Sequence, residues 1–308
     1  MARLSGGARL KIVLVVLLCL VLVAGAWGVL RTGPFFVPFW NTSMLGSHNW
    51  TSGDTSIDAA RVTSLSVECF AGKVTVREHE GPAVEVRQVT NNGASLSEDQ
   101  KVHWALEGGT LYVASERPVP HFLPFSGAYQ VEVLLPKRMA QQLDDVKAYV
   151  HSGELQASGL GCFQLTASVA SGELVLKGVA ADTLAFDLAS GTIKASGMTA
   201  ETLDLDLASG EAEVAGSLKA IHTDAASGSI RLVSSVAPTS MSINTVSGSC
   251  LIAIPENKGF TAQVSKVSGR FVCDFETVRK GDDTYVHGDG HADYRFDMAS
   301  GSVELQKG

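Results

Sequence analysis

Aspartates recur at a regular spacing in the C-terminal half of this sequence. Asp187, Asp206 and Asp224 each lie three residues before a Ser-Gly pair, and Asp204 lies two residues before Asp206. If neighbouring copies of the pattern lie on adjacent strands, the carboxylates stack at about 4.8 Å, and each neighbouring pair costs up to about 1 kcal/mol in water. The pattern indicates either a solvated ladder that keeps the exterior soluble, or a site for calcium or for a cationic partner such as a basic peptide.

A repeat of about 20 residues must position these aspartates. Successive Ser-Gly pairs are separated by 19, 19, 19, 18, 20, 21 and 32 residues, and Ala71-Gly72 is a degenerate earlier copy. Because glycine tolerates a positive φ and serine bonds to nearby backbone groups, we expect each pair to form a tight corner. The expected corner glycines are Gly72, Gly153, Gly172, Gly191, Gly210, Gly228, Gly248, Gly269 and Gly301.

Apolar and polar residues alternate on both sides of each corner. In one copy Leu203, Leu205 and Leu207 precede the corner, and Ala212 and Val214 follow it. Alternation with a period of two predicts a strand with one buried face. A second set of glycines ends the following strand in four consecutive copies, at Gly159, Gly178, Gly197 and Gly216. Two corners per copy predict a coil that stacks on its neighbours with parallel strands.

The predicted fold class is therefore all-β, a parallel β-solenoid with coils of about 19 residues. The preference for right-handed crossovers predicts a right-handed solenoid. We expect the solenoid domain to cover residues 59–308, with regular coils over 143–308. The last coil ends close to the final residue, which predicts strand edges left open there.

Residues 83–136 lack the Ser-Gly repeat and read as antiparallel strands with a hairpin, which would cap the N-terminal end of the stack. Between these strands lies a proline-rich loop that contains Phe122 and Phe125. The loop is either a cover folded over the end of the solenoid or an exposed apolar binding loop.

The N-terminus carries a membrane signal. Residues 12–30 are an uncharged run of 19 apolar or small residues, long enough to cross a bilayer as one helix. Basic residues lie mainly before this run, which places a tail of residues 1–11 in the cytoplasm and the solenoid outside. The alternative is a signal peptide cleaved after Ala24-Gly25-Ala26. Residues 31–58 are polar in their second half and are expected to be a linker.

Charge and motif content exclude several function classes. A formal charge of −8 argues against nucleic acid, because phosphate binding requires a basic face. The eight histidines are scattered, and no phosphate-binding glycine loop is present. We therefore expect no enzymatic activity, no catalytic residue and no cofactor.

One short stretch resembles a ligand set for a metal. His287, Asp289, His291 and Asp293 alternate along the chain, and four such residues on one strand face would lie together. The glycines at 288 and 290 favour a solvated turn instead, and we predict no metal site here.

Several segments resemble the bacterial putative-adhesin domain family, a group of envelope β-solenoids. The resemblance is carried by "VEVLLP", by the Ser-Gly corners, by "LIAIPENKGFTAQVSKVSGRFVCDF" from Leu251, and by "GDGHADYRFDMASGSVEL" from Gly288. It covers about residues 59–308 and brings no catalytic residues. It implies a bacterial protein of the cell envelope or cell surface, often membrane-anchored, with some relatives linked to membrane stress.

Two functions follow as expectations. The first is a single-pass, membrane-anchored extracytoplasmic module that binds envelope or surface components, or cationic peptides, without catalysis. The second is a structural protein that self-associates end to end through its coils.

Overall fold

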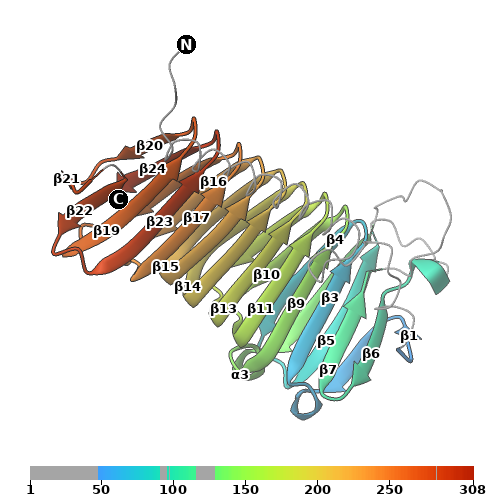
Figure 1. Ribbon diagram of the computed structural model, residues 1–308. Coiled ribbons are helices and arrows are strands. Elements are labelled where there is room, and N and C mark those ends of the chain that lie inside the picture. The colour runs from blue at the N-terminus through green and yellow to red at the C-terminus, as the bar shows by residue number, and fades with distance from the viewer. Residues whose placement is uncertain (1–47, 91–95, 97, 116–128, 282) are drawn as a thin grey trace.

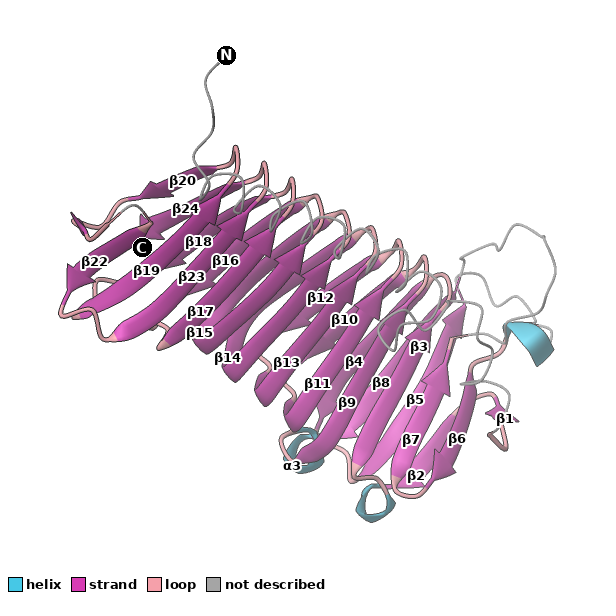
Figure 2. Cartoon of the chain, viewed as in Figure 1, coloured by secondary structure: helices cyan, strands magenta, loops and turns pink. Residues whose placement is uncertain are grey.

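The computed structural model describes residues 48–90, 96, 98–115, 129–281 and 283–308 as a stack of β-coils along one long axis (Figure 1). Strands make up nearly all of its regular structure (Figure 2). The described helical elements are short: η1 (Ala59–Arg61), η2 (Glu98–Gln100) and α3 (Lys137–Ala140). The all-β prediction is confirmed.

Each coil contributes to two faces that meet at the Ser-Gly corner. The first face holds the strands that run into the corner: β3 (Ser64–Cys69), β9 (Leu143–Val150), β11 (Gly161–Val169), β13 (Ala180–Leu188), β17 (Ser240–Thr245), β23 (Ala292–Met298) and β19 (Gly259–Lys266). The second face holds the strands that leave it: β4 (Lys73–His79), β10 (Glu154–Ser158), β12 (Glu173–Lys177), β16 (Ser229–Ser234), β18 (Ser249–Ile254), β24 (Ser302–Lys307) and β20 (Arg270–Cys273). Two long strands, β14 (Thr192–Leu207) and β15 (Glu211–Ala225), bend from the second face of one coil into the first face of the next.

Neighbouring coils pair in parallel and keep their apolar residues in register. On the first face Leu184, Leu203 and Ile221 are register partners, and each is 0% exposed. Every coil therefore buries one side of its strands against the coils above and below, and a single coil has no core of its own. This arrangement confirms the parallel β-solenoid, while its right-handedness stays a prediction.

The Ser-Gly corners are built by hydrogen bonds from coil to coil. The Ser190 hydroxyl donates to the carbonyl of Ala170 at 3.0 Å, and the amide of Thr192 donates to the carbonyl of Gly172 at 3.0 Å. The same two bonds recur along the stack, so serine and glycine at the corner serve the backbone.

The reason for glycine at these corners differs in part from the one expected. Gly72, Gly191, Gly210 and Gly228 have a positive φ, whereas the corner glycines at 153, 172, 248, 269 and 301 do not. All the corner glycines from Gly153 onward, whatever their φ, come close to the next coil. A Cβ on any of them would lie 2.2 to 3.0 Å from the carbonyl oxygen of the corner glycine in the adjacent coil. Close stacking of the corners is therefore the common requirement.

The C-terminal coil does not end the stack, and the prediction of open edges beside it is wrong. β23 pairs with β17 on one side and β19 on the other, and β24 pairs with β18 and β20. The last coil in the sequence is thus inserted between two earlier coils (Figure 1). The coil of β19 and β20 lies outermost, and a hairpin of β21 (Val278–Arg279) and β22 (Thr284–Gly288) covers the edge of β19.

At the N-terminal end, too, the order of coils in space differs from their order in the sequence. The coil of β3 and β4 pairs with β9 and β10 on one side, and with β7 (Thr110–Ala114) and β8 (Tyr129–Pro136) on the other. The section at 83–136 is therefore mixed, because β7 and β8 run parallel to the coil while β5 (Ala83–Thr90) and β6 (His103–Glu107) run antiparallel to β8 and β7. It caps the stack as expected, but it is not purely antiparallel.

Part of the predicted linker is ordered. Residues 51–58 carry β1 (Thr51–Ser52) and β2 (Thr55–Asp58), which pair with β6 and β5. The predicted tail and membrane-crossing run at 1–30, and the loop with Phe122 and Phe125, lie outside the described residues. Within the described ranges, no helix has the length and hydropathy to cross a membrane.

Candidate functional site

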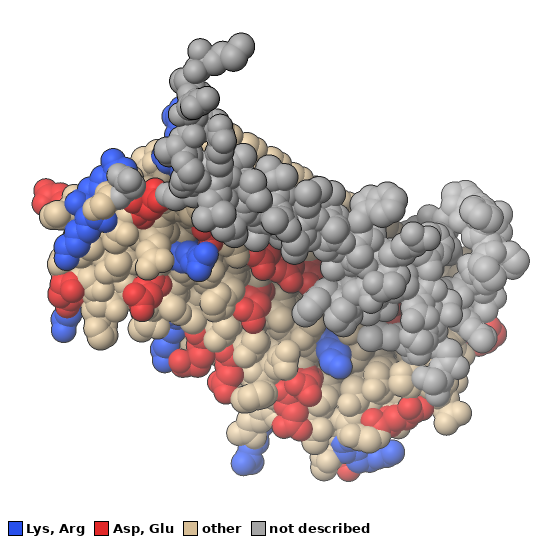
Figure 3. Space-filling view, viewed as in Figure 1, with Lys and Arg blue, Asp and Glu red and all other residues tan. Residues whose placement is uncertain are grey.

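Strands β13, β14 and β15 place the predicted aspartates in one column. Asp187, Asp206 and Asp224 are register partners on the first face, and Asp204 points to the same side from β14. The alternation that buries Leu205 and Leu207 turns these carboxylates outward. We call the four aspartates the acidic column; acidic side chains gather over these middle strands in Figure 3.

Neutral donors flank the column at both ends, but its centre has none. The Ser168 hydroxyl on β11 lies 3.5 Å from Asp187 Oδ2, and the Asn244 side-chain amide on β17 donates to Asp224 Oδ1 at 2.7 Å. Within the described part of the chain, Asp206 has neither a hydrogen-bond donor nor an ion-pair partner. Its register neighbours on both sides are carboxylates.

Two aspartates of the column have a pKa above that of an ordinary aspartate. Desolvation raises the pKa of Asp187, although its bond from Ser168 opposes the shift. Desolvation, followed by repulsion from Asp187, Asp224 and Asp204, raises the pKa of Asp206 to about 6. Because Asp206 keeps an exposed surface, solvent screens part of this cost.

On the second face, carboxylates that stack in register have cationic partners. There, Glu154 and Glu173 are register partners, but each has a lysine beside it: Lys73 Nζ lies 3.3 Å from Glu154 Oε1, and Lys194 Nζ lies 2.7 Å from Glu173 Oε1. The same backbone therefore accepts paired charges, and the acidic column differs from these glutamates in having no ion pair among the described residues.

The acidic column suits some cationic ligands better than others. Among the residues described, no three of His, Cys, Asp and Glu are grouped closely enough to hold a metal ion. Carboxylates repeated at strand spacing along three strands instead match a partner that carries several positive charges in a row. Of the two ligands considered from the sequence, a basic peptide fits this geometry better than calcium.

The raised pKa of Asp206 predicts a pH dependence of stability. An unfolded aspartate titrates near 3.9, so the folded chain holds an extra proton between about pH 4 and 6. Stability therefore falls as pH rises through this window and stays lower above it. Asp206→Asn is expected to raise the free energy of unfolding at neutral pH by about 1 kcal/mol, after discounting for solvent exposure, and to flatten the fall. Urea unfolding at a series of pH values measures both effects.

Asp145→Asn is the matched control, since Asp145 is an exposed aspartate of β9 outside the column. This variant should show the same dependence of the free energy of unfolding on pH as the native chain. An Asp206→Asn variant with an unchanged unfolding midpoint at neutral pH would contradict the repulsion in the column.

The other site candidates from the sequence fall elsewhere. The His287 ring packs against Phe260 and Phe275, while Asp289 Oδ1 accepts a bond from the His291 amide. Gly288 and Gly290 both have a positive φ, so this stretch is the turn that its glycines predict. Phe122 and Phe125 lie outside the described residues.

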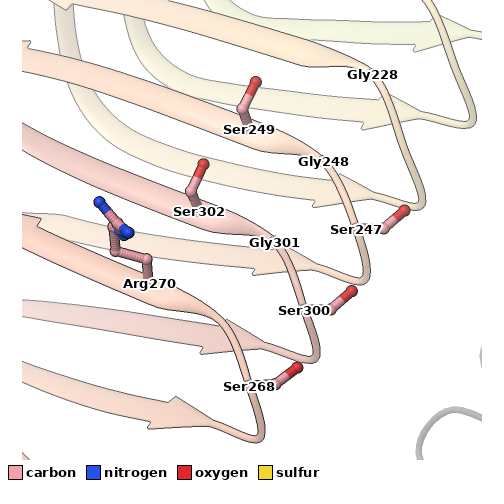
Figure 4. Close-up of a pocket in the computed structure, with 9 residues that line it drawn as sticks. All are labelled: Gly228, Ser247, Gly248, Ser249, Ser268, Arg270, Ser300, Gly301 and Ser302. Atoms are coloured by element: carbon pink, nitrogen blue, oxygen red, sulfur yellow. The ribbon is translucent and has the colours of Figure 1, made fainter.

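The structure also has a polar groove that the sequence interpretation missed. A shallow depression of about 300 Å³ follows the corners of four adjacent coils (Figure 4) and is lined by Gly228, Ser247, Gly248, Ser249, Ser268, Arg270, Ser300, Gly301 and Ser302. The hydroxyls of Ser247, Ser268 and Ser300 already donate to backbone carbonyls. The only signal for the groove was the long interval of 32 residues before Ser300, which marks an excursion of the chain.

The stacked coils and their outward columns define this chain as a β-solenoid repeat protein. Residues 62–306 match the family described as Toastrack DUF4097, and the chain belongs to that family. This membership confirms the resemblance to putative-adhesin domains drawn from the Ser-Gly corners.

Similar solved structures come from several bacteria. One described as a putative lipid binding protein from Parabacteroides distasonis is 17% identical, with a TM-score of 0.51, covering 85% of this chain and 98% of its own. A putative adhesin from the same organism is 16% identical, with a TM-score of 0.43, covering 84% and 98%. A putative cell adhesion protein from Clostridium sporogenes is 9% identical, with a TM-score of 0.31, covering 84% and 100%. No curated protein matches the chain.

Proposed function

We propose that this protein is a non-catalytic binding or adhesion module, tethered to the membrane and displayed outside the cytoplasm. The observation that carries the proposal is the acidic column, in which carboxylates of three adjacent strands stand in register and form no ion pair with any described residue. The partner we propose is a cationic envelope or surface component, with a basic peptide as its simplest form.

The energetics of the column support a binding role. Desolvation of Asp206, and then repulsion from the neighbouring carboxylates, raises its pKa to about 6 and costs stability in the free protein at neutral pH. A partner with positive charges along the column would reduce the repulsion between the carboxylates on binding. This reduction makes the free energy of association more favourable. Sequences commonly depart from local stability rules where a function requires it.

The membrane tether rests on the sequence. The uncharged run at 12–30, preceded by basic residues, supports a single-pass anchor with the N-terminus in the cytoplasm. Fractionation and protease shaving of intact cells test this topology. Loss of the solenoid from shaved cells supports it, while full protection of the solenoid would overturn it. A role in the response to envelope stress would also require the solenoid to lie outside the cytoplasm.

Binding is tested with the full chain and an oligolysine peptide. The triple variant Asp187→Asn, Asp206→Asn and Asp224→Asn should weaken the peptide's affinity at least about tenfold at low salt, since it removes most of the column's charge. Each asparagine keeps the shape of the side chain, so the fold should persist.

The matched control removes three carboxylates from the second face, at Glu173, Glu211 and Glu213, by change to glutamine. It alters the net charge equally and should leave the affinity nearly unchanged. If both triple variants lose affinity alike, the effect is one of net charge. If neither loses affinity, the column is a solvated ladder and the proposed site is wrong.

A further inference from the structure

Strand β20 leaves one short edge of the second face uncovered. It pairs with β24 on one side, and in the described part of the chain no strand pairs with its other side (Figure 1). The β21–β22 hairpin covers the neighbouring edge of β19, and β5 covers β8 at the opposite end of the stack. An uncovered edge presents free backbone donors and acceptors to another strand.

The hydrogen bonds to β24 show which groups lie on this edge. The amide of Arg270 donates to the carbonyl of Gly301 at 3.0 Å, and the amide of Asp274 donates to that of Leu305 at 3.0 Å. Backbone groups alternate in direction along a strand, so the amides and carbonyls of Phe271 and Cys273 point away from β24. None of these outward groups has a recorded partner within the described residues.

The side chains on this strand are only partly buried. Phe271 and Cys273 point inward but stay half-buried, whereas their register partners Val303 and Leu305 are 0% exposed. Val272 points outward and is 38% exposed. Another strand along the edge would complete the burial that the inner coils already have.

The sequence of the edge is complementary to itself. In "RFVCD", from Arg270 to Asp274, an antiparallel pairing centred on Val272 sets Arg270 opposite Asp274 of a second copy, and Phe271 opposite its Cys273. In this register the outward groups of Phe271 and Cys273 face each other and exchange hydrogen bonds. Arg270 and Asp274 form no ion pair in the described part of the single chain, and Lys307, which interacts with Asp274 at longer range, is paired with Glu256.

We propose that two copies of this protein pair through β20 in an antiparallel, two-fold arrangement centred on Val272. The two-fold axis makes the contact the same for both copies, so the assembly closes at two and does not extend into a filament. The contact is short, and we expect a weak dimer with a dissociation constant on the order of 10 μM. This dimer is independent of ligand binding at the acidic column.

A charge reversal on the full chain in detergent tests the proposal. Arg270→Asp places aspartates against aspartates across the two-fold axis, and Asp274→Arg places arginines against arginines. Each single variant should weaken dimerisation at least about tenfold by sedimentation equilibrium, since both pairs become repulsive. The double variant restores opposite charges and should recover most of the native affinity.

Mixing the two single variants gives the sharpest readout. A heterodimer of Arg270→Asp with Asp274→Arg again sets opposite charges at both positions, so the mixture should associate while each variant alone does not. Both side chains are exposed, and unchanged circular dichroism will show that the variants fold. A native chain that stays monomeric at about 100 μM, or a dimer indifferent to these reversals, overturns the proposal.

Discussion

Replacing Gly191 with alanine is expected to lower the free energy of unfolding of the coil stack by about 3 kcal/mol. Gly191 has a φ of +122°, and an added Cβ would lie 2.5 Å from the carbonyl oxygen of Gly172. That oxygen also accepts the amide of Thr192, so the corner cannot open without loss of a coil-to-coil bond. Urea unfolding of the full chain in detergent, followed by circular dichroism, measures the change.

Gly178→Ala is the matched control for this effect. Gly178 also has a positive φ, of +59°, but nothing lies within 4 Å of its added Cβ. It should cost only the conformational strain, about 1 kcal/mol. If the two alanine variants unfold at the same denaturant concentration, close stacking of the corners does not stabilise this fold.

The second large effect is expected close to the C-terminus. Leu305→Ala should cost about 3 kcal/mol, because Leu305 is 0% exposed and lies in a coil that is paired on both sides. If the C-terminal coil ended the stack, Leu305 would be partly exposed, and shortening its side chain would cost much less. The same unfolding assay measures the loss.

Val272→Ala on the outermost coil provides the comparison. Val272 points outward from β20 and is 38% exposed, so its truncation should cost less than about 1 kcal/mol. A Leu305→Ala variant no less stable than Val272→Ala would place the C-terminal coil at the end of the stack instead of inside it.

The local structure was predictable because it depends on short-range patterns. Alternation such as Leu203, Leu205 and Leu207 requires a strand with one buried face, and the recurring Ser-Gly pairs mark where strands turn. The register that aligns Asp187 with Asp206 follows from the same repeat. The column itself was therefore visible in the sequence.

The order of the coils in space was not predictable from these patterns. The coil that contains Ser247-Gly248 could stack on the coil of Ser268-Gly269 as well as on the coil of Ser300-Gly301, because all three carry the same alternation and the same corner. Spacing alone therefore does not show which coils are neighbours. The excursion through the β21–β22 hairpin lets the last coil return between the two earlier ones. The β20 edge was missed for the same reason, since it exists only with that order.

Chemistry within the column also depended on the structure. Spacing predicts that carboxylates stack, but not that Ser168 and Asn244 supply donors only at the two ends. The pKa of Asp206 is raised to about 6 by desolvation first and by the three neighbouring carboxylates second, and the degree of desolvation is known only from the structure. Sequence reasoning favoured no member of the column over another.

Hydrogen exchange of the full chain, resolved by peptide, tests most directly whether the coils stack in register with the C-terminal coil inside. Amides of β23 and β24, in residues 292–307, should exchange as slowly as those of β14. Amides of residues 270–279, at the outer end, should exchange much sooner. Rapid exchange across residues 292–307, with slow exchange at 270–279, would contradict this coil order and remove the edge on which the proposed dimer depends.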